Sequence, residues 1–197
     1  MTRKPLVLIA LLLLSQLVFA QQTNKPPDVT SAPQADYVFI LKTVFLVRHA
    51  ERADEPRQDP PLTEKGVARS EALARLLSTA DIKAIYTSQF ARTKLTGEPL
   101  AKQIGVPVTP ITLKTSPSNP RAIAEESTQE IVEKIMSQQT DGNILVIGHS
   151  NSIPDVIKML GGNDVPTIDE KKFDDLFIVT VYANRRAKVV HLKYGGE

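Results

Sequence analysis

The sequence predicts an α/β domain in which a central, mostly parallel sheet is covered by helices on both faces, a three-layer α/β/α arrangement. From Thr43 onward, short apolar runs alternate with helical patterns, which is the order of elements that builds such a sheet. The chain has 197 residues, 42% of them hydrophobic and 23% charged, so it can bury a real core. Length and composition favour one globular domain over two domains or a multispan membrane protein.

Four segments are predicted to be strands because they are short, apolar and bounded by turn-forming residues. In chain order they are 43–47, 84–87, 106–108 and 143–147. Helical periodicity predicts four helices between and after them. These are 63–77, 88–103, 120–139 and 152–160. The last two apolar runs, 177–182 and 188–192, are expected to form a closing hairpin around Asn184.

Helix ends are predicted from capping residues. Thr63 and Ser88 are expected to cap the first two helices, because a hydroxyl can accept the free N–H groups of a first turn. Gly105 is expected to end the second helix, since glycine readily adopts the left-handed conformation that follows many helices.

The N-terminus has the pattern of a secretory signal peptide. Arg3 and Lys4 precede an apolar run at 6–14, and small residues lie at the −3 and −1 places of a cleavage site after Ala20. An uncleaved anchor is the alternative, but the stretch is shorter than the roughly 20 apolar residues that a spanning helix needs. We therefore predict a signal peptide at 1–20, a flexible tether at 21–40 and the folded domain at 41–197, in a periplasmic or secreted protein.

Charge and cysteine content exclude several classes of protein. Lys and Arg outnumber Asp and Glu by 24 to 22, and the surplus pair lies in the predicted signal peptide, so the domain has no basic excess for nucleic acid. The absence of cysteine excludes disulfides, iron–sulfur clusters, thiolate nucleophiles and Cys-ligated zinc.

Histidine and arginine residues follow three predicted strands at their carboxyl ends. Arg48 and His49 come after the first strand, Arg92 lies just beyond the second, and His149 follows the strand 143–147. Ligands bind at this edge of such sheets. An imidazole can attack phosphorus, and guanidinium groups bind phosphoryl oxygens while offsetting their charge. This set predicts phosphoryl transfer through a phosphohistidine.

Around these residues the chain resembles the histidine phosphatase superfamily, in its phosphoglycerate-mutase-like branch 1. The matching motifs are Arg-His at 48–49, Pro-Leu-Thr-Glu-Lys-Gly at 61–66, Tyr-Thr-Ser at 86–88 with Arg92 beyond it, and Gly-His-Ser at 148–150. The resemblance spans about residues 43–194 and implies the α/β/α fold of that family.

The resemblance also implies roles for individual residues. His49 would be the nucleophile, and Arg48, Arg92 and His149 would form the phosphate pocket. Arg52 matches an Arg-His-x-Glu-Arg variant of the first motif, in which the second arginine also faces the phosphate.

Two further interpretations concern residues near this pocket. Ser150 is expected to cap the helix that begins near Ser152 and to lie at the substrate. The two histidines, with Glu51 or Asp54, could alternatively bind zinc, but the neighbouring arginines would repel a dication. We predict no metal and no cofactor.

The general acid is where the sequence departs from the family pattern. Relatives supply a glutamate after the second helix, whereas 111–121 contains neither an acid nor an aromatic residue. Glu125 and Glu126 are the nearest downstream carboxylates, although both could simply be solvated in the first turns of a helix. Glu51, two residues after His49, is the competing candidate. We select Glu125 and leave Glu51 and Glu126 open.

Together these observations predict a metal-independent phosphomonoester hydrolase. The missing insertion leaves no lid to retain an intermediate, which favours a phosphatase over a mutase. Exported relatives include a phosphatase that acts on the heptose phosphate of lipopolysaccharide, so an envelope glycan phosphate and a small scavenged phosphomonoester are both candidate substrates. A noncatalytic phospholigand-binding module, which keeps the pocket but lacks an effective acid, is the alternative of another class.

Overall fold

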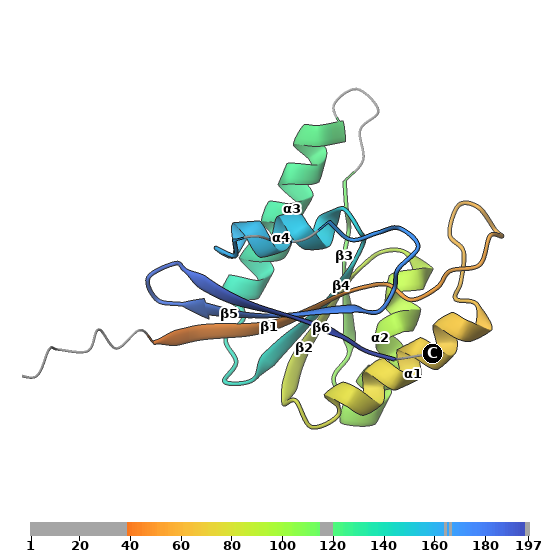
Figure 1. The fold of residues 1–197 in the computed structure, drawn as a ribbon, viewed down its shortest axis with the longest axis horizontal. Helices are drawn as coiled ribbons and strands as arrows, with labels where there is room; N and C mark the ends of the chain where they lie inside the picture. The colour runs from red at the N-terminus through yellow and green to blue at the C-terminus, as the bar shows by residue number, and fades with distance from the viewer. Residues whose placement is uncertain (1–38, 115–119, 164, 166, 196–197) are drawn as a thin grey trace, which may run out of the picture. The chain divides into compact units, whose positions relative to one another are not determined.

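The computed structural model describes residues 39–114, 120–163, 165 and 167–195. Within them it forms six strands and four helices, which are labelled in Figure 1. The strands are β1 (Ile40–Arg48), β2 (Ile82–Ser88), β3 (Val108–Ile111), β4 (Asn143–Gly148), β5 (Asp175–Tyr182) and β6 (Ala187–Lys193). The helices are α1 (Glu64–Leu77), α2 (Ala91–Ile104), α3 (Pro120–Ser137) and α4 (Ser152–Met159). The predicted signal peptide and nearly all of the predicted tether lie outside the described residues.

The strands form one mixed sheet in the order β3-β2-β4-β1-β5-β6. β3, β2, β4 and β1 are parallel, and β5 and β6 run antiparallel at one side as the predicted hairpin. In the register of the central strands, Arg48 lies opposite Gly148 and Thr87 lies opposite Ile147. The residues that follow these three strands therefore meet at one edge of the sheet.

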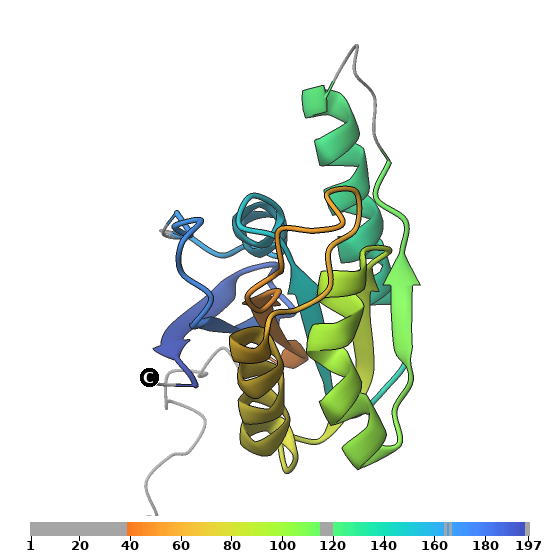
Figure 2. The same ribbon diagram turned by 90° about the vertical axis from the view of Figure 1, so that its right-hand side faces the viewer.

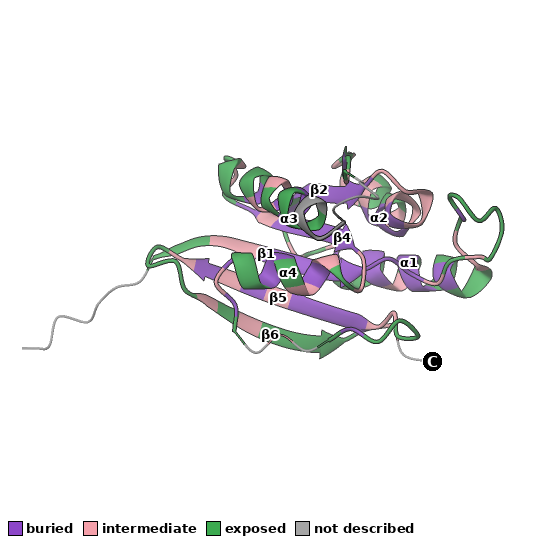
Figure 3. Cartoon of the chain, turned by 90° about the horizontal axis from the view of Figure 1, so that it is seen from above, coloured by how far each residue is buried: buried purple, intermediate pink, exposed green. Residues whose placement is uncertain are grey.

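Helices cover both faces of the sheet, as the sequence predicts (Figures 1 and 2). On one face α1 and α2 pack through residues such as Leu73 and Leu100, which are fully buried. On the other face α3 and α4 pack through Ile135 and Ile153, also fully buried. Alternate residues of the central strands enter one core or the other, so these strands are buried on both faces, as Figure 3 shows. The α/β/α fold class is confirmed.

The predicted helix caps are partly right. Thr63 caps α1, with its hydroxyl accepting from the N–H of Gly66, and Gly105 ends α2 in the left-handed conformation. Ser88 is not a cap, because α2 begins only at Ala91 and Ser88 is still part of β2. The error arose because we predicted that this strand ends at residue 87, whereas β2 extends to Ser88.

The segment after His49 is held tightly against α1. The N–H of Thr63 donates to the carbonyl of Glu51 at 2.9 Å, and a Cβ atom on Gly66 would lie 2.2 Å from that same oxygen. Only glycine permits this close approach of the helix to the chain that carries the nucleophile. No helix in the described part of the chain is long and apolar enough to cross a bilayer.

Candidate active site

The structure brings the two histidines and the three predicted arginines together at the carboxyl edge of the sheet. The ring centroids of His49 and His149 are 5.4 Å apart. The positive charges of Arg48, Arg92 and Arg52 all act on His49. These residues come from the ends of β1 and β4 and from the start of α2, as the register of the strands predicts.

His49 is held as a neutral imidazole with one free nitrogen. Its Nδ1 lies 2.7 Å from the carbonyl oxygen of Ala50, and because a carbonyl can only accept, Nδ1 carries the proton. The lone pair is therefore on Nε2. The pKa of His49 is lowered to about 4, chiefly because the ring is buried. The hydrogen bond to Ala50 opposes this lowering, and the positive charges of the three arginines add to it. An unprotonated Nε2 is what a nucleophile needs.

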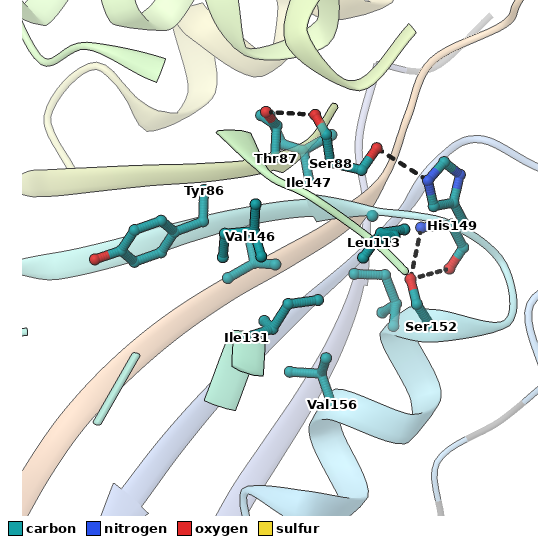
Figure 4. Close-up of a pocket in the computed structure, with 13 residues that line it drawn as sticks. Tyr86, Thr87, Ser88, Leu113, Ile131, Val146, Ile147, His149, Ser152 and Val156 are labelled. Atoms are coloured by element: carbon teal, nitrogen blue, oxygen red, sulfur yellow. Dashed lines mark hydrogen bonds between the residues drawn. The ribbon is translucent and has the colours of Figure 1, made fainter. Parts of the chain in front are cut away.

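His149 is oriented by Ser88. The hydroxyl of Ser88 lies 3.1 Å from Nε2 of His149 and 2.8 Å from the hydroxyl of Thr93 (Figure 4 shows the first of these bonds). Behind His149 is a mostly apolar pocket between β2, β4, α3 and α4, lined by residues such as Ile131 and Val156. Burial is the largest cause that lowers the pKa of His149 to about 3, and the charges of Arg92, His49 and Arg48 add to it.

Arg48 and Arg92 present unsatisfied donors. The Nε atoms of both are buried and have no hydrogen-bond partner within the described residues. One Nη of Arg48 donates to the carbonyls of Asp169 and Lys172, at 3.0 and 3.1 Å. Buried donors without an acceptor are costly, and guanidinium groups are preferred donors to the oxygens of a phosphate. Burial lowers the pKa of both arginines, yet guanidinium remains charged at every physiological pH.

Arg52 lies at the rim of this cluster. It is exposed and pairs with Leu62 in an isolated antiparallel bridge at the start of the loop after His49. Its charge acts on His49, Arg48 and Arg92 alike, so its position fits the predicted contact with a phosphate.

Glu51 does not have the environment of a proton donor. Its carboxylate accepts three hydrogen bonds from Arg69, at 2.9 to 3.1 Å, in an ion pair whose side chains are only 15% and 8% exposed. Burial alone would raise the pKa of Glu51, but the bonds and charge of Arg69 outweigh it and hold the pKa below its ordinary value. Glu51 thus stays ionised and anchors the nucleophile's segment to α1.

Glu125 and Glu126 are on the exposed side of α3. Glu126 forms an ion pair with Lys114, and Glu125 lines a surface groove between α3 and α4 together with Asp155 and Lys158. Neither carboxylate lines the pocket behind His149. The role of Glu125 as the acid stays a prediction, and this placement argues against it.

Ser150 does not cap the following helix. The cap position of α4 is Asn151, without a side-chain bond, and the hydroxyl of Ser152 instead accepts from the N–H of His149 at 3.0 Å. Our prediction was wrong here because it placed the turn one residue too early. Ser150 itself is half-buried next to His149, so a contact with substrate stays a prediction.

Two phenylalanines that the sequence analysis did not find belong to the site. Phe173, just before β5, packs 4.2 Å from the Arg48 guanidinium and 5.9 Å from the His49 ring. Phe90, just before α2, packs 4.4 Å from the Arg92 guanidinium and 5.7 Å from the His149 ring. Each ring excludes water from one arginine and one histidine. Phe173 has no local motif that would have revealed it.

Among the described residues, no group of three or more His, Asp or Glu side chains could hold a metal ion. The charges around His49 are mostly positive, so the cluster suits an anion.

Comparison with known proteins agrees with this chemistry. Residues 44–113, which contain His49 and Arg92, match the model of the histidine phosphatase superfamily (branch 1). The match covers the first part of the described domain. No curated protein matches the chain in sequence. This match to the superfamily's model supports the prediction of a phosphatase.

Solved structures share the fold of this domain. Protein histidine phosphatase SixA, complexed with tungstate, is 18% identical and has a TM-score of 0.57, over 77% of this chain and 96% of that chain. A mycobacterial glucosyl-3-phosphoglycerate phosphatase, complexed with VO3, is 13% identical with a TM-score of 0.59, over 78% of this chain and 100% of that chain. At these identities the likeness shows the shared fold.

Proposed function

We propose that the protein is a phosphomonoester hydrolase that works without a metal, through a phosphohistidine on His49. The observation that carries this proposal is the combination of a neutral His49 with a free Nε2 and two buried arginine Nε–H donors without an acceptor. A phosphoryl group that accepts from Arg48 and Arg92 would sit beside that nitrogen. The solved relatives named above, with tungstate and VO3, carry oxyanions of this kind.

The reaction follows from this arrangement in two steps. Nε2 of His49 attacks phosphorus, the bond from phosphorus to the ester oxygen breaks, and the leaving oxygen takes its proton from a general acid or from water. Water then attacks the phosphohistidine, which restores the free imidazole and releases inorganic phosphate. Arg48 and Arg92 offset the charge on the equatorial oxygens in both steps. His149, held by Ser88, lies where its ring can contact the same phosphoryl group.

The covalent intermediate is the decisive test. Rapid mixing with a labelled phosphomonoester, followed by quench, is expected to trap an acid-labile, base-stable phosphoenzyme that His49→Ala abolishes. His191→Ala is a matched control, because His191 stacks on Phe177 and bonds Asp175 on the β5–β6 hairpin, outside the cluster. Label on a serine, or turnover without any label on the protein, would refute the mechanism.

A noncatalytic phospholigand-binding module is the second candidate. It is favoured by one observation, that Glu51 and Glu126 are each held in an ion pair with a basic side chain. A binding module would bind phosphate or vanadate but release nothing from p-nitrophenyl phosphate, whose phenolate leaves without an acid. Turnover of that ester supports the enzyme.

We also propose that the protein is exported and acts on a phosphate in the cell envelope or the medium. The support is the pattern of residues 1–20 in the sequence. N-terminal sequencing of the protein recovered from the periplasm or medium is expected to start at Gln21. Measuring phosphate release from an envelope glycan phosphate and from a small phosphomonoester distinguishes these two candidate substrates.

A further inference from the structure

A carboxylate outside the predicted set, Asp59, joins two parts of the candidate site. Its Oδ1 accepts a 2.7 Å hydrogen bond from the backbone N–H of Ala91. Ala91 is the first residue of α2 and Arg92 is the second. The bond is therefore made at the residue directly before an arginine that faces the phosphate position.

The N-terminus of α2 lacks a cap of its own. Phe90 occupies the cap position and makes no side-chain bond to the helix. A carboxylate is a preferred acceptor at this place, because it bonds a free N–H and its charge is favourable at the positive end of the helix dipole. Asp59 supplies this cap from a different segment of the chain.

Asp59 also carries charge that matters to Arg92. Burial and the charge of Arg52 both lower the pKa of Arg92, and the charge of Asp59 opposes them. Arg92 is otherwise held by its packing on Phe90, while its buried Nε has no partner in the described chain. A misplaced helix start would thus move the Arg92 guanidinium with little to restrain it.

The segment that carries Asp59 is itself tied to the nucleophile. It leaves the sheet after His49, and its two ends are joined where the N–H of Ala53 donates to the carbonyl of Pro61 at 2.8 Å. Asp59 lies close to this closed base. The contact with Ala91 therefore links the start of α2 to the segment that follows His49.

We propose that Asp59 is a positioning residue that holds Arg92 in place for the phosphoryl group. This inference rests on the proposed function, because it assumes that Arg92 binds the transferred phosphate. It assigns Asp59 no contact with substrate. A positioning role predicts that the effect of Asp59 depends on the presence of the Arg92 side chain.

The test is a double-mutant cycle read by phosphate binding to the full chain in a calorimeter. Asp59→Ala is expected to weaken phosphate binding about tenfold. In an Arg92→Ala background the same change is expected to add less than about twofold. Asp54→Ala is the matched control, since Asp54 is an exposed carboxylate of the same loop with no hydrogen bond in the described structure. This control substitution is expected to change phosphate binding less than about twofold. An equal loss in both backgrounds, or equal effects of the Asp59 and Asp54 changes, would overturn the proposal.

Turnover and a second variant complete the design. Asp59→Ala is expected to lower kcat/KM equally for p-nitrophenyl phosphate and an alkyl phosphate, because the phosphoryl group is common to both. Asp59→Asn keeps an oxygen for the Ala91 N–H but loses the charge, so its loss of kcat/KM is expected to be smaller than that of Asp59→Ala. If Asp59→Ala unfolds below the assay temperature, Asp59→Asn replaces it in the double-mutant cycle. Absent turnover in the unmodified protein would refute the proposed function, while phosphate binding would still decide the role of Asp59.

Discussion

The lowered pKa of His49 has a direct consequence for the pH dependence of turnover. His49 must be neutral to attack phosphorus, and its pKa is lowered from the ordinary 6.5 to about 4. At pH 5 a group with a pKa of about 4 is about 90% neutral, whereas one with a pKa of 6.5 is about 3% neutral. The structure thus predicts that kcat/KM at pH 5 exceeds that of an ordinary histidine enzyme by about 30-fold, relative to each enzyme's plateau.

The measurement is kcat/KM for p-nitrophenyl phosphate from pH 4 to 8, corrected for the second ionisation of the substrate. The expected profile stays flat down to about pH 5 and falls through the pKa of the free enzyme near 4. Circular dichroism must accompany it, because a histidine whose pKa is lower in the folded state destabilises that state as pH falls from about 6.5 toward 4. An acid limb with its midpoint near 6.5, in folded protein, would show that burial does not keep His49 neutral.

Two further predictions concern the ions around the nucleophile. Glu51→Gln is expected to lower the free energy of unfolding by about 3 kcal/mol, because it leaves the buried Arg69 without its partner charge. Chemical denaturation measures this loss. A stable variant that loses activity only on alkyl phosphates would instead make Glu51 the acid. Turnover is expected to be unchanged by EDTA, since Arg48 and Arg92 supply the positive charge, and loss of activity that zinc or magnesium restores would contradict this.

Much of the fold follows from local patterns in the sequence. The buried strands β1 and β4 are continuous apolar runs, and α1 has a hydroxyl cap and an apolar stripe, so short-range signals were enough. The parallel register then places His49, Arg92 and His149 together with no further information. These residues could be selected because His49 and His149 directly follow strands and Arg92 lies four residues beyond the end of another.

The parts that could not be predicted depend on contacts between distant segments. Phe173 packs on Arg48 although 125 positions separate the two residues in the sequence. Asp59 caps a helix that begins 32 residues further on. Ser88 has the residue type of a helix cap, but the extent of β2 decides that it bonds His149 instead. The sequence could not decide among Glu51, Glu125 and Glu126 for the same reason, since only the fold shows that Glu51 is paired with Arg69.

The loop between Arg52 and Leu62 is closed at its base, which matters for how such a domain can change over evolution. The bridge between these two residues and the 2.8 Å bond from Ala53 to Pro61 hold the ends of the loop together whatever its interior does. Lengthening a loop is inexpensive, at about 0.6 kcal/mol for each doubling. Insertions at positions 54–58 would therefore enlarge an exposed loop beside the candidate site without moving His49, so a lineage could change this surface by growth of one loop.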